Sequence, residues 1–171
     1  MNTCAQCARL QKTCCEREAT KIALTGGDIA RISQFAGQED FYELKPVEEE
    51  LKDVYANPAC YTEDDYIYVT YLFDDQGRRN ILRKNPDQTC CFVTLTGCSL
   101  PHDIRPLLCR IYPYDWNDRL EIWIDGSYCP ASLFKDEEDM VKKVGLSAAE
   151  ALELIKLFYA EIMDGKASHE R

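Results

Sequence analysis

Apolar residues recur at helical spacing in the segment LTGGDIARISQFAG, which covers positions 24–37. The apolar positions on one face of the segment are Ile29, Ile32 and Phe35. Ahead of them, Thr25 and Asp28 stand three positions apart, which is the pattern of a capping box with Asp in place of the usual Glu. The pattern predicts a short amphipathic helix that ends at Gly37, because glycine readily adopts the left-handed conformation found after helix ends.

A second helical pattern lies near the end of the chain. Its apolar positions are Leu152, Ile155, Tyr159 and Ile162. Ser147 and Glu150 precede them with the spacing of a capping box. We therefore expect a helix over about 147–164 that closes at Gly165, followed by a polar, frayed tail over 166–171.

Shorter segments are rich in the β-branched and aromatic residues that favour strands. They cover positions 66–73, 80–84, 91–95 and 120–124. The polar positions 74–77 predict a turn that joins the first two of these segments into a hairpin. The acidic stretch 40–53 is predicted to be a solvated helix or loop.

These patterns predict an α+β fold: a small, irregular, metal-stapled domain with short antiparallel strands and flanking helices. The sequence contains no internal repeat and no Gly/Ser-rich or Pro-rich linker that would divide it. We therefore expect a single cysteine-cluster domain over 1–171.

The charge balance is acidic and changes the expected partners. Asp and Glu total 30 against 20 Lys and Arg, which gives a net charge of -10. Nucleic acid and anionic membrane surfaces are therefore not expected as partners. No apolar run approaches the roughly 20 residues that cross a bilayer.

Whether the cysteines indicate metal binding or disulfides depends on the cellular compartment of the protein. The first residues, MNTCAQCARLQKTCC, lack the apolar run of a secretory signal, so we expect a cytoplasmic protein. Thiols are kept reduced in the cytoplasm, and the 10 cysteines of the chain then indicate metal binding rather than disulfides. In an exported protein, a disulfide framework would be the alternative.

The cysteines with the spacing of metal ligands form two sets of four. The first set is Cys4, Cys7, Cys14 and Cys15, and the second is Cys91, Cys98, Cys109 and Cys129. Cys4-x2-Cys7 has the spacing of a metal knuckle, in which a tight turn aims both sulfur atoms at one ion. Neighbouring side chains usually point apart, so Cys14 and Cys15 are expected to serve different positions. Four thiolates are the ligand set of a structural zinc ion or of one cubane iron–sulfur cluster.

Arg105 and Arg110 stand on either side of Cys109. A divalent ion with four thiolates carries net negative charge, and burying that charge requires compensation. We expect the two guanidinium groups to donate hydrogen bonds to sulfur and to bind the cofactor in this way.

Some positions are left open by spacing alone. Cys90 adjoins Cys91 and can take its place as a ligand. Cys60 fits neither set and is expected to be a core or surface thiol. His102 follows Cys98 by four positions and can replace a cysteine, although an exposed loop histidine is the plainer interpretation.

Taken together, the opening cysteines, the segment LTGGDIARI and the run Arg-Pro-x2-Cys-Arg-x-Tyr-Pro over 105–113 resemble the YkgJ-type cysteine-cluster family of CxxCxxCC zinc- or iron-chelating domains. The resemblance extends from Cys4 to Cys129. It implies metal ligation by the eight cysteines of the two sets. Some members of that family resemble flagellin lysine N-methylases.

The sequence is compatible with more than one function. The first hypothesis is a metal-binding protein with an iron–sulfur cluster, for which four thiolates suggest the 4Fe-4S type, and a redox or protein-modification role. The alternatives are a structural zinc module that acts as a binding or adaptor protein, and a methylase-like enzyme. The chain lacks the G-x-G-x-x-G signature of dinucleotide sites and has only 2 histidines, so its sequence does not decide whether it is an enzyme.

Overall fold

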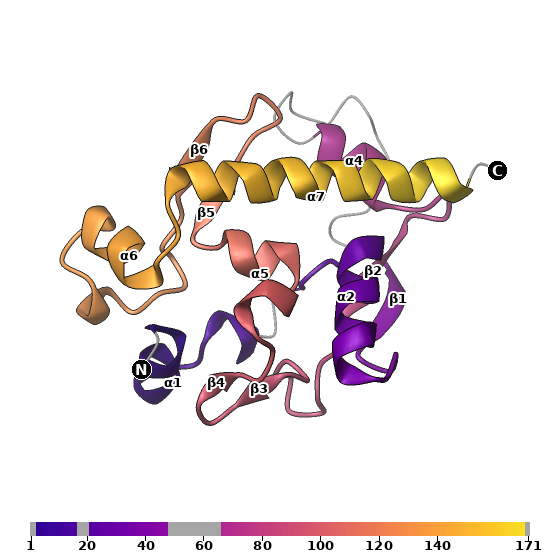
Figure 1. Cartoon of the computed structure of the whole chain (residues 1–171). Helices are drawn as coiled ribbons and strands as arrows, with labels where there is room; N and C mark the ends of the chain where they lie inside the picture. Colours follow the sequence, from indigo (N-terminus) through magenta and orange to yellow (C-terminus); the bar gives the residue numbers. More distant parts are fainter. Residues whose placement is uncertain (1–2, 17–20, 48–65, 170–171) are drawn as a thin grey trace.

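The computed structural model describes residues 3–16, 21–47 and 66–169, apart from the side chains of Cys4 and of 167–169. The long helix α7 (Ala148–His169) runs along one side of the molecule, and α4 (Tyr66–Leu72) and α5 (Leu107–Ile111) pack against it (Figure 1). The larger apolar core lies at this junction. Its buried members are Leu107, Ile111, Tyr114, Leu146, Ala151, Ile155, Phe158, Tyr159 and Ile162.

The strands of the described residues form three separate antiparallel pairs. The pairs are β1 (Tyr42–Pro46) with β2 (Arg78–Leu82), β3 (Val93–Thr94) with β4 (Gly97–Cys98), and β5 (Tyr114–Trp116) with β6 (Ile122–Ile124). Together with the helices, these pairs make the fold α+β, as predicted. The arrangement of helices and strands does not by itself test the expected metal stapling.

A smaller apolar cluster lies between α2 (Gly26–Ala36) and the β1–β2 pair. Its buried members are Leu24, Ile32, Phe41, Leu82, Cys90 and Leu100. Phe41 is only 2% exposed, and its ring contacts the ring of Phe92 at 5.8 Å between centroids. A cysteine, Cys90, therefore belongs to this core.

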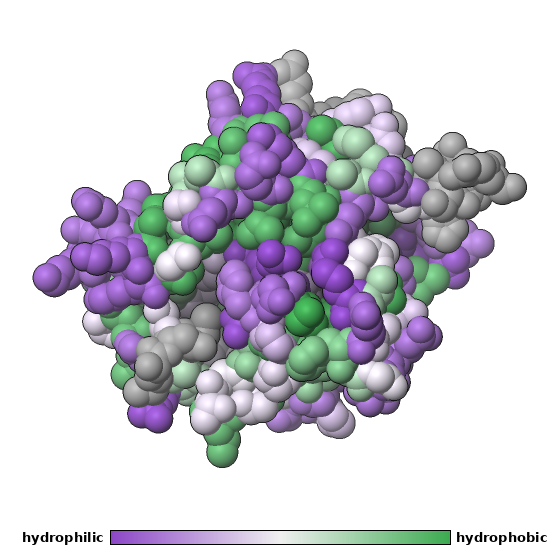
Figure 2. Space-filling model, viewed as in Figure 1, coloured by the Kyte–Doolittle hydropathy of each residue, from purple (hydrophilic) through white to green (hydrophobic). Residues whose placement is uncertain are grey.

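The remaining elements lie around these two cores. They are α1 (Thr3–Leu10), η1 (Cys14–Glu16), η4 (His102–Ile104), η5 (Ala131–Leu133) and α6 (Glu137–Val144). Among the described residues, no helix combines the length and the apolar character needed to cross a membrane. Figure 2 shows hydrophilic and hydrophobic residues interspersed over one face of the molecule.

The predicted helix over the LTGGDIARI segment is confirmed, with both of its caps. The Asp28 N–H donates to Thr25 Oγ1 at 2.9 Å, and the Thr25 N–H donates to Asp28 Oδ2 at 3.2 Å. Gly37 closes α2 with φ 67°, and its N–H donates to the carbonyl of Ser33 at 2.9 Å. Local sequence is sufficient for these features because each cap is built from groups within one helical turn.

The capping box at the start of α7 is also confirmed, but its predicted end is wrong. Ser147 N–H donates to Glu150 Oε2 at 2.9 Å. The helix passes through Gly165 and continues to His169, so most of the expected frayed tail is helical. Lys166 Nζ donates to the Thr70 carbonyl at 2.7 Å, which fastens this end of α7 to α4. Positions 170–171 lie outside the described residues.

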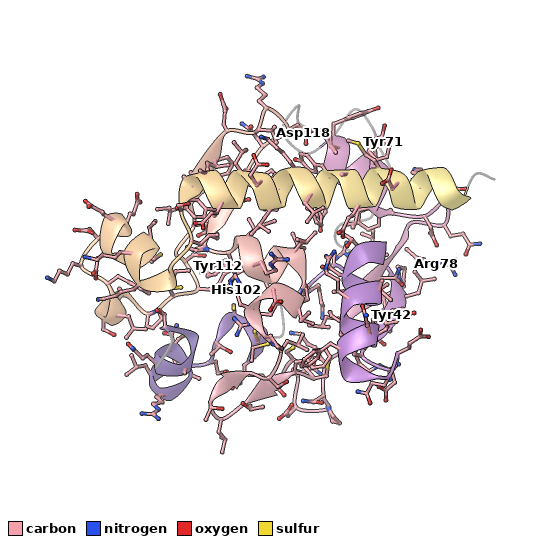
Figure 3. The ribbon with its side chains drawn as sticks, in the orientation of Figure 1. Tyr42, Tyr71, Arg78, His102, Tyr112 and Asp118 are labelled. Atoms are coloured by element: carbon pink, nitrogen blue, oxygen red, sulfur yellow. The ribbon has the colours of Figure 1, made fainter. Side chains whose placement is uncertain are left out.

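The predicted strand over 66–73 is wrong, because α4 occupies 66–72. The Ile67 N–H at its start donates to Asp118 Oδ2 at 2.8 Å, and Tyr68 stacks on Phe158 of α7 at 6.0 Å. Packing against α7 therefore overrides the strand propensity of the β-branched and aromatic residues. Figure 3 shows Tyr71 and Asp118 on the same side of α7.

Other strand predictions need smaller corrections. The partner of β2 is β1, with Tyr42 opposite Leu82, so the stretch predicted as a solvated helix or loop contains a strand. Its remainder, over 48–53, lies outside the described residues. The turn after α4 is confirmed, because the Gly77 N–H donates to the Asp74 carbonyl at 2.9 Å. The third and fourth predicted strands shorten to β3 and β6.

The two glycines at the start of α2 offer a matched test of packing. A Cβ atom at Gly27 would overlap the carboxylate of Glu161 from α7, whereas a Cβ atom at Gly26 would meet nothing. Gly27→Ala is therefore expected to lower the free energy of unfolding by about 1–2 kcal/mol, since the displaced carboxylate loses partly buried hydrogen bonds. Gly26→Ala should leave it unchanged or raise it by up to about 1 kcal/mol. Urea unfolding of both variants checks this, and an equal effect at the two positions would contradict it.

Candidate functional site

The thiols of Cys14 and Cys15 begin a row of neighbouring sulfur atoms. Both residues lie in η1, and their Sγ atoms are 4.0 Å apart. The expectation that these adjacent side chains point apart is wrong, because their sulfur atoms approach each other to hydrogen-bond distance. The hydrogen bond with Cys15, followed by burial, raises the pKa of the Cys14 thiol well above its usual range.

The row continues from Cys15 to Cys90, although 75 positions separate them in the chain. The Cys90 N–H donates to the Cys15 carbonyl at 2.8 Å, and the two thiols are hydrogen-bonded to each other. The bond with Cys14 lowers the pKa of Cys15. The bond with Cys90 and burial outweigh this and raise the pKa to about 12. The bond with Cys15 lowers the pKa of Cys90, while the bond with Cys91 and burial raise it to about 12. Without a bound metal, both groups are therefore protonated at neutral pH.

Cys109 brings a further segment to the same place. It lies in α5, and burial raises the pKa of its thiol well above the usual value. The charges of Cys15, Cys14, Cys90 and Cys98 raise it further, in that order. Cysteines of η1, of position 90, of β4 and of α5 therefore share one environment, in which Cys90 is buried and the others are partly buried. We call these five residues the thiol cluster.

Cys91 lies at the edge of the thiol cluster. Its thiol donates to the Phe41 carbonyl at 3.8 Å, and its hydrogen bond with Cys90 lowers its pKa, while burial opposes this. Cys90 is the more buried of the pair, at 6% exposed, and it is the one that acts on Cys15 and Cys109. The geometry therefore favours Cys90 over Cys91 in the choice that the sequence left open.

Cys129 approaches the thiol cluster through a tyrosine. Its Sγ lies 3.5 Å from the hydroxyl of Tyr112, which immediately follows α5. Burial raises the pKa of Tyr112, followed by the bond with Cys129 and the charges of Cys129 and Cys14. Figure 3 shows Tyr112 and His102 close to α5. Tyr112 therefore connects Cys129 with the η1 end of the cluster.

The first pair of predicted ligands occurs in a helix rather than in a tight knuckle turn. Cys4 and Cys7 both belong to α1, where residues three apart share one face. Cys7 is buried, and α1 packs against β4, so that Ala5 is the neighbour of Gly97. The Cys4 side chain and the whole of Cys60 lie outside the described part of the chain.

The predicted cofactor-binding arginines make other contacts among the described residues. Arg105 Nε donates to the Leu100 carbonyl at 3.1 Å, which closes the loop after Cys98. Burial lowers the pKa of Arg110, as does the charge of Arg31, while acidic groups of α2 and α7 oppose this. Arg110 Nε is buried and has no hydrogen-bond partner. The role of both guanidinium groups as donors to sulfur stays a prediction.

His102 lies on the exposed side of this region, in η4. Partial burial lowers the pKa of its imidazole, and the charges of Arg105 and Arg110 lower it further. None of the cysteines contributes to this shift. The geometry therefore agrees with an exposed loop histidine rather than with a ligand.

Asp28 is a site residue for which spacing suggested only a capping role. Its carboxylate is fully buried and accepts from the Leu107 N–H at 2.9 Å and from Arg31 Nη2 at 2.7 Å, in addition to Thr25. Leu107 is the first residue of α5, so Asp28 joins α2 to the helix that carries Cys109. Burial raises the pKa of Asp28, and the bonds from Thr25, Arg31 and Leu107 oppose this. The only signal in the sequence was its place in the LTGGDIARI segment.

Glu161 completes the network around Asp28 from the side of α7. Its carboxylate accepts hydrogen bonds from Thr25 Oγ1 and from the guanidinium group of Arg31. No local pattern could predict this contact, because 136 positions separate Thr25 from Glu161. The network therefore connects α2, α5 and α7.

The donor atoms of the thiol cluster fit a thiolate-bound metal in type and number. Two thiolates on a tetrahedral zinc ion lie about 3.8 Å apart for Zn–S bonds of about 2.3 Å, close to the separation in η1. Among the side chains that the structure describes, no three His, Cys, Asp or Glu already have the arrangement of a metal site. Binding would therefore require these thiols to lose protons and to rotate toward a common centre.

Comparison with known proteins gives no relative for this chain. No family model matches it, and neither a curated protein nor a solved structure does. The resemblance to the YkgJ-type cysteine-cluster family therefore remains a prediction that rests on the motifs of this sequence.

Proposed function

We propose that this chain binds metal through the thiol cluster, with an iron–sulfur cluster preferred over zinc and with a redox or protein-modification role. The observation that supports the proposal is the shared environment of five cysteines from four separate chain segments. Cysteines pack well as isolated core residues, but that role does not explain why five collect at one place.

Cys14, Cys15, Cys90 and Cys109 are the ligands that we propose for one centre. Their thiols act on one another, whereas Cys91 contacts the Phe41 carbonyl at the edge. Cys98 from β4 supplies a further thiol beside them. An iron–sulfur cluster held in this way would supply one-electron transfer.

A second group of the predicted ligands lies toward α1. Cys7 belongs to α1, and Gln11 Nε2, just beyond that helix, donates to the Tyr128 carbonyl at 3.0 Å. This contact brings the segment before Cys129 to the end of α1. We propose that Cys4, Cys7 and Cys129 either complete the centre or form a second one.

Buried thiolates require positive charge nearby. Arg110 has a buried Nε without a hydrogen-bond partner and follows Cys109 directly. Metal binding would bring further negative charge to this guanidinium group, whose Nη1 already donates to the Asp103 carbonyl at 3.4 Å. Arg105, whose Nε holds the loop after Cys98, is the second candidate for this role.

Structural zinc is the second candidate function, and one distance favours it. The 4.0 Å between the sulfur atoms of Cys14 and Cys15 is close to the separation of two ligands on one zinc ion. In this alternative the chain is a binding or adaptor protein, and zinc stabilises the surface that contacts the partner. Ligand type alone does not separate the two metals, because thiolates bind both.

Anaerobic purification followed by metal analysis tests the proposal. We expect a brown protein with broad visible absorption that bleaches with dithionite, and with iron and inorganic sulfide in equal amounts. A colourless protein with stoichiometric zinc would replace the iron–sulfur centre by the structural zinc module. A protein without either metal, both as isolated and after reconstitution, would overturn metal binding altogether.

A further inference from the structure

The sulfur atoms of Cys14, Cys15, Cys90 and Cys91 follow one another in a continuous row. The Cys14 and Cys15 sulfur atoms are 4.0 Å apart, and hydrogen bonds join the Cys15 thiol to Cys90 and the Cys90 thiol to Cys91. Such a row offers three neighbouring pairs for disulfide formation.

The central pair, Cys15 and Cys90, differs from the two outer pairs in the size of the ring that a disulfide would close. A disulfide between adjacent residues closes a small ring and distorts the peptide group between them, which is normally planar and trans. Cys15 and Cys90 are distant in sequence, so their bond would impose no such distortion. The hydrogen bond of 2.8 Å from the Cys90 N–H to the Cys15 carbonyl places their backbones side by side, as a disulfide with Cα atoms about 4.4–6.8 Å apart requires.

A hollow beside the central pair gives small molecules a route to it. The hollow has about 210 Å³ of free space, including its opening to solvent, and is lined by Cys15, Ile22, Leu82, Arg83, Lys84 and Cys90. Arg83 is exposed at this side of the molecule. Hydrogen peroxide, which is little larger than water, is the oxidant that fits this hollow, and both thiols of the central pair belong to the lining.

We propose that Cys15 and Cys90 form a reversible disulfide when hydrogen peroxide oxidises the metal-free chain. One thiol passes its proton to the departing oxygen as its sulfur atom attacks the other peroxide oxygen, which breaks the O–O bond, releases water and leaves a sulfenic acid. The second sulfur atom then displaces the hydroxyl group of the sulfenic acid, which leaves as water with the proton of the second thiol. In total, two thiols lose two protons and two electrons, and hydrogen peroxide is reduced to two molecules of water.

The consequence for metal binding rests on the proposed function. Cys15 and Cys90 are two of the proposed ligands, so the disulfide and the metal exclude each other. The bond would also cross-link η1 to the segment before β3. Oxidation would thus convert the chain to a disulfide form that does not bind metal. A thiol reductant would return it to the metal-binding form.

The test treats the full-length chain with hydrogen peroxide, with and without a chelator, and then blocks the remaining thiols by alkylation. Tryptic peptides are analysed without reduction by tandem mass spectrometry. We expect a cross-link between Cys15 and Cys90 that disappears on reduction and that forms at least about tenfold less in the metal-loaded chain.

The neighbouring Cys91 provides a matched control. Cys15→Ser and Cys90→Ser should lower the yield of the cross-linked peptide by at least about tenfold, whereas Cys91→Ser should keep it within about twofold of the wild type. Circular dichroism before oxidation shows which variants are folded. If Cys90→Ser alone failed to fold, the wild-type cross-link map and Cys15→Ser would still show whether Cys15 and Cys90 form the disulfide.

Each outcome separates this inference from the proposed function. A disulfide between other cysteines, or oxidation that stops at sulfenic acid, would overturn the inference even if the protein binds metal. A Cys15–Cys90 cross-link in a chain that never binds metal would support the inference and overturn only the proposed function.

Discussion

Asp28→Ala is expected to lower the free energy of unfolding by about 3–5 kcal/mol, which is a large part of the stability of a small domain. The carboxylate is fully buried and accepts hydrogen bonds from the N–H groups of Thr25 and Leu107 and from Arg31. Alanine would leave the N–H groups of Thr25 and Leu107 without their acceptor at a buried site, while the partly exposed Arg31 would keep only Glu161. Such unsatisfied groups cost more than the bonds themselves contribute.

Urea unfolding measures this effect, and Asp136 provides the matched control. Asp136 also accepts a hydrogen bond from a helix N–H, that of Asp139 at 2.8 Å, but it does so at the exposed start of α6. Asp136→Ala should therefore cost only about 1 kcal/mol. If the two variants lost equal stability, Asp28 would be an ordinary helix cap and not the joint between α2 and α5.

Glu161→Gln separates the charge of this network from its hydrogen bonds. The amide oxygen can still accept from Arg31 or Thr25, but the ion pair with Arg31 is lost. We expect a loss of about 1–2 kcal/mol, smaller than that of Asp28→Ala because Glu161 is partly exposed and water can replace one partner. A larger loss than that of Asp28→Ala would place the centre of the network at α7 instead.

Cys90→Ser is expected to weaken metal binding by more than about 100-fold, whereas Cys91→Ser should change it by less than about tenfold. The thiol of Cys90 is buried and acts on Cys15 and Cys109, while that of Cys91 donates to the Phe41 carbonyl at the edge of the thiol cluster. Serine keeps nearly the same volume in both variants, so the comparison isolates the sulfur atom.

The measurement is metal content per chain after anaerobic purification, together with competition against a chromophoric chelator. Cys109→Ser should behave like Cys90→Ser, because the charges of the other four members of the thiol cluster act on the Cys109 thiol. Loss of metal in Cys91→Ser with retention in Cys90→Ser would restore the ligand set first expected from spacing. Unchanged metal content in all three variants would place the metal outside the thiol cluster.

The parts of this fold that sequence predicts correctly are those governed by neighbours within one or two turns. Thr25, Asp28 and Gly37 set the ends of α2, and Ser147 sets the start of α7. The polar turn after α4 belongs to the same class. Each depends on hydrogen bonds between groups a few positions apart, so no distant contact is needed to specify it.

The cysteine pattern predicted which kind of side chain gathers in the candidate site, but not which individual cysteines lie together. Spacing indicated that thiols from both halves of the chain act together, and it left the choice between Cys90 and Cys91 open. One position of difference moves a side chain from the buried to the exposed side of an extended segment. The contacts of Cys15 and Phe41, which are distant in sequence, distinguish the two cysteines.

By itself, the sequence determined the capped helices, the mixed α+β class and the presence of many thiols in a strongly acidic chain. Only the tertiary structure decided that 66–72 is a helix, because its β-branched and aromatic side chains gain more from packing on α7 than from strand pairing. Tertiary structure alone also decided that Asp28 connects α2 to α5, since its partner Leu107 is 79 positions away. Burial of a carboxylate is tolerable only where distant donors meet it, and local sequence cannot show where they will be.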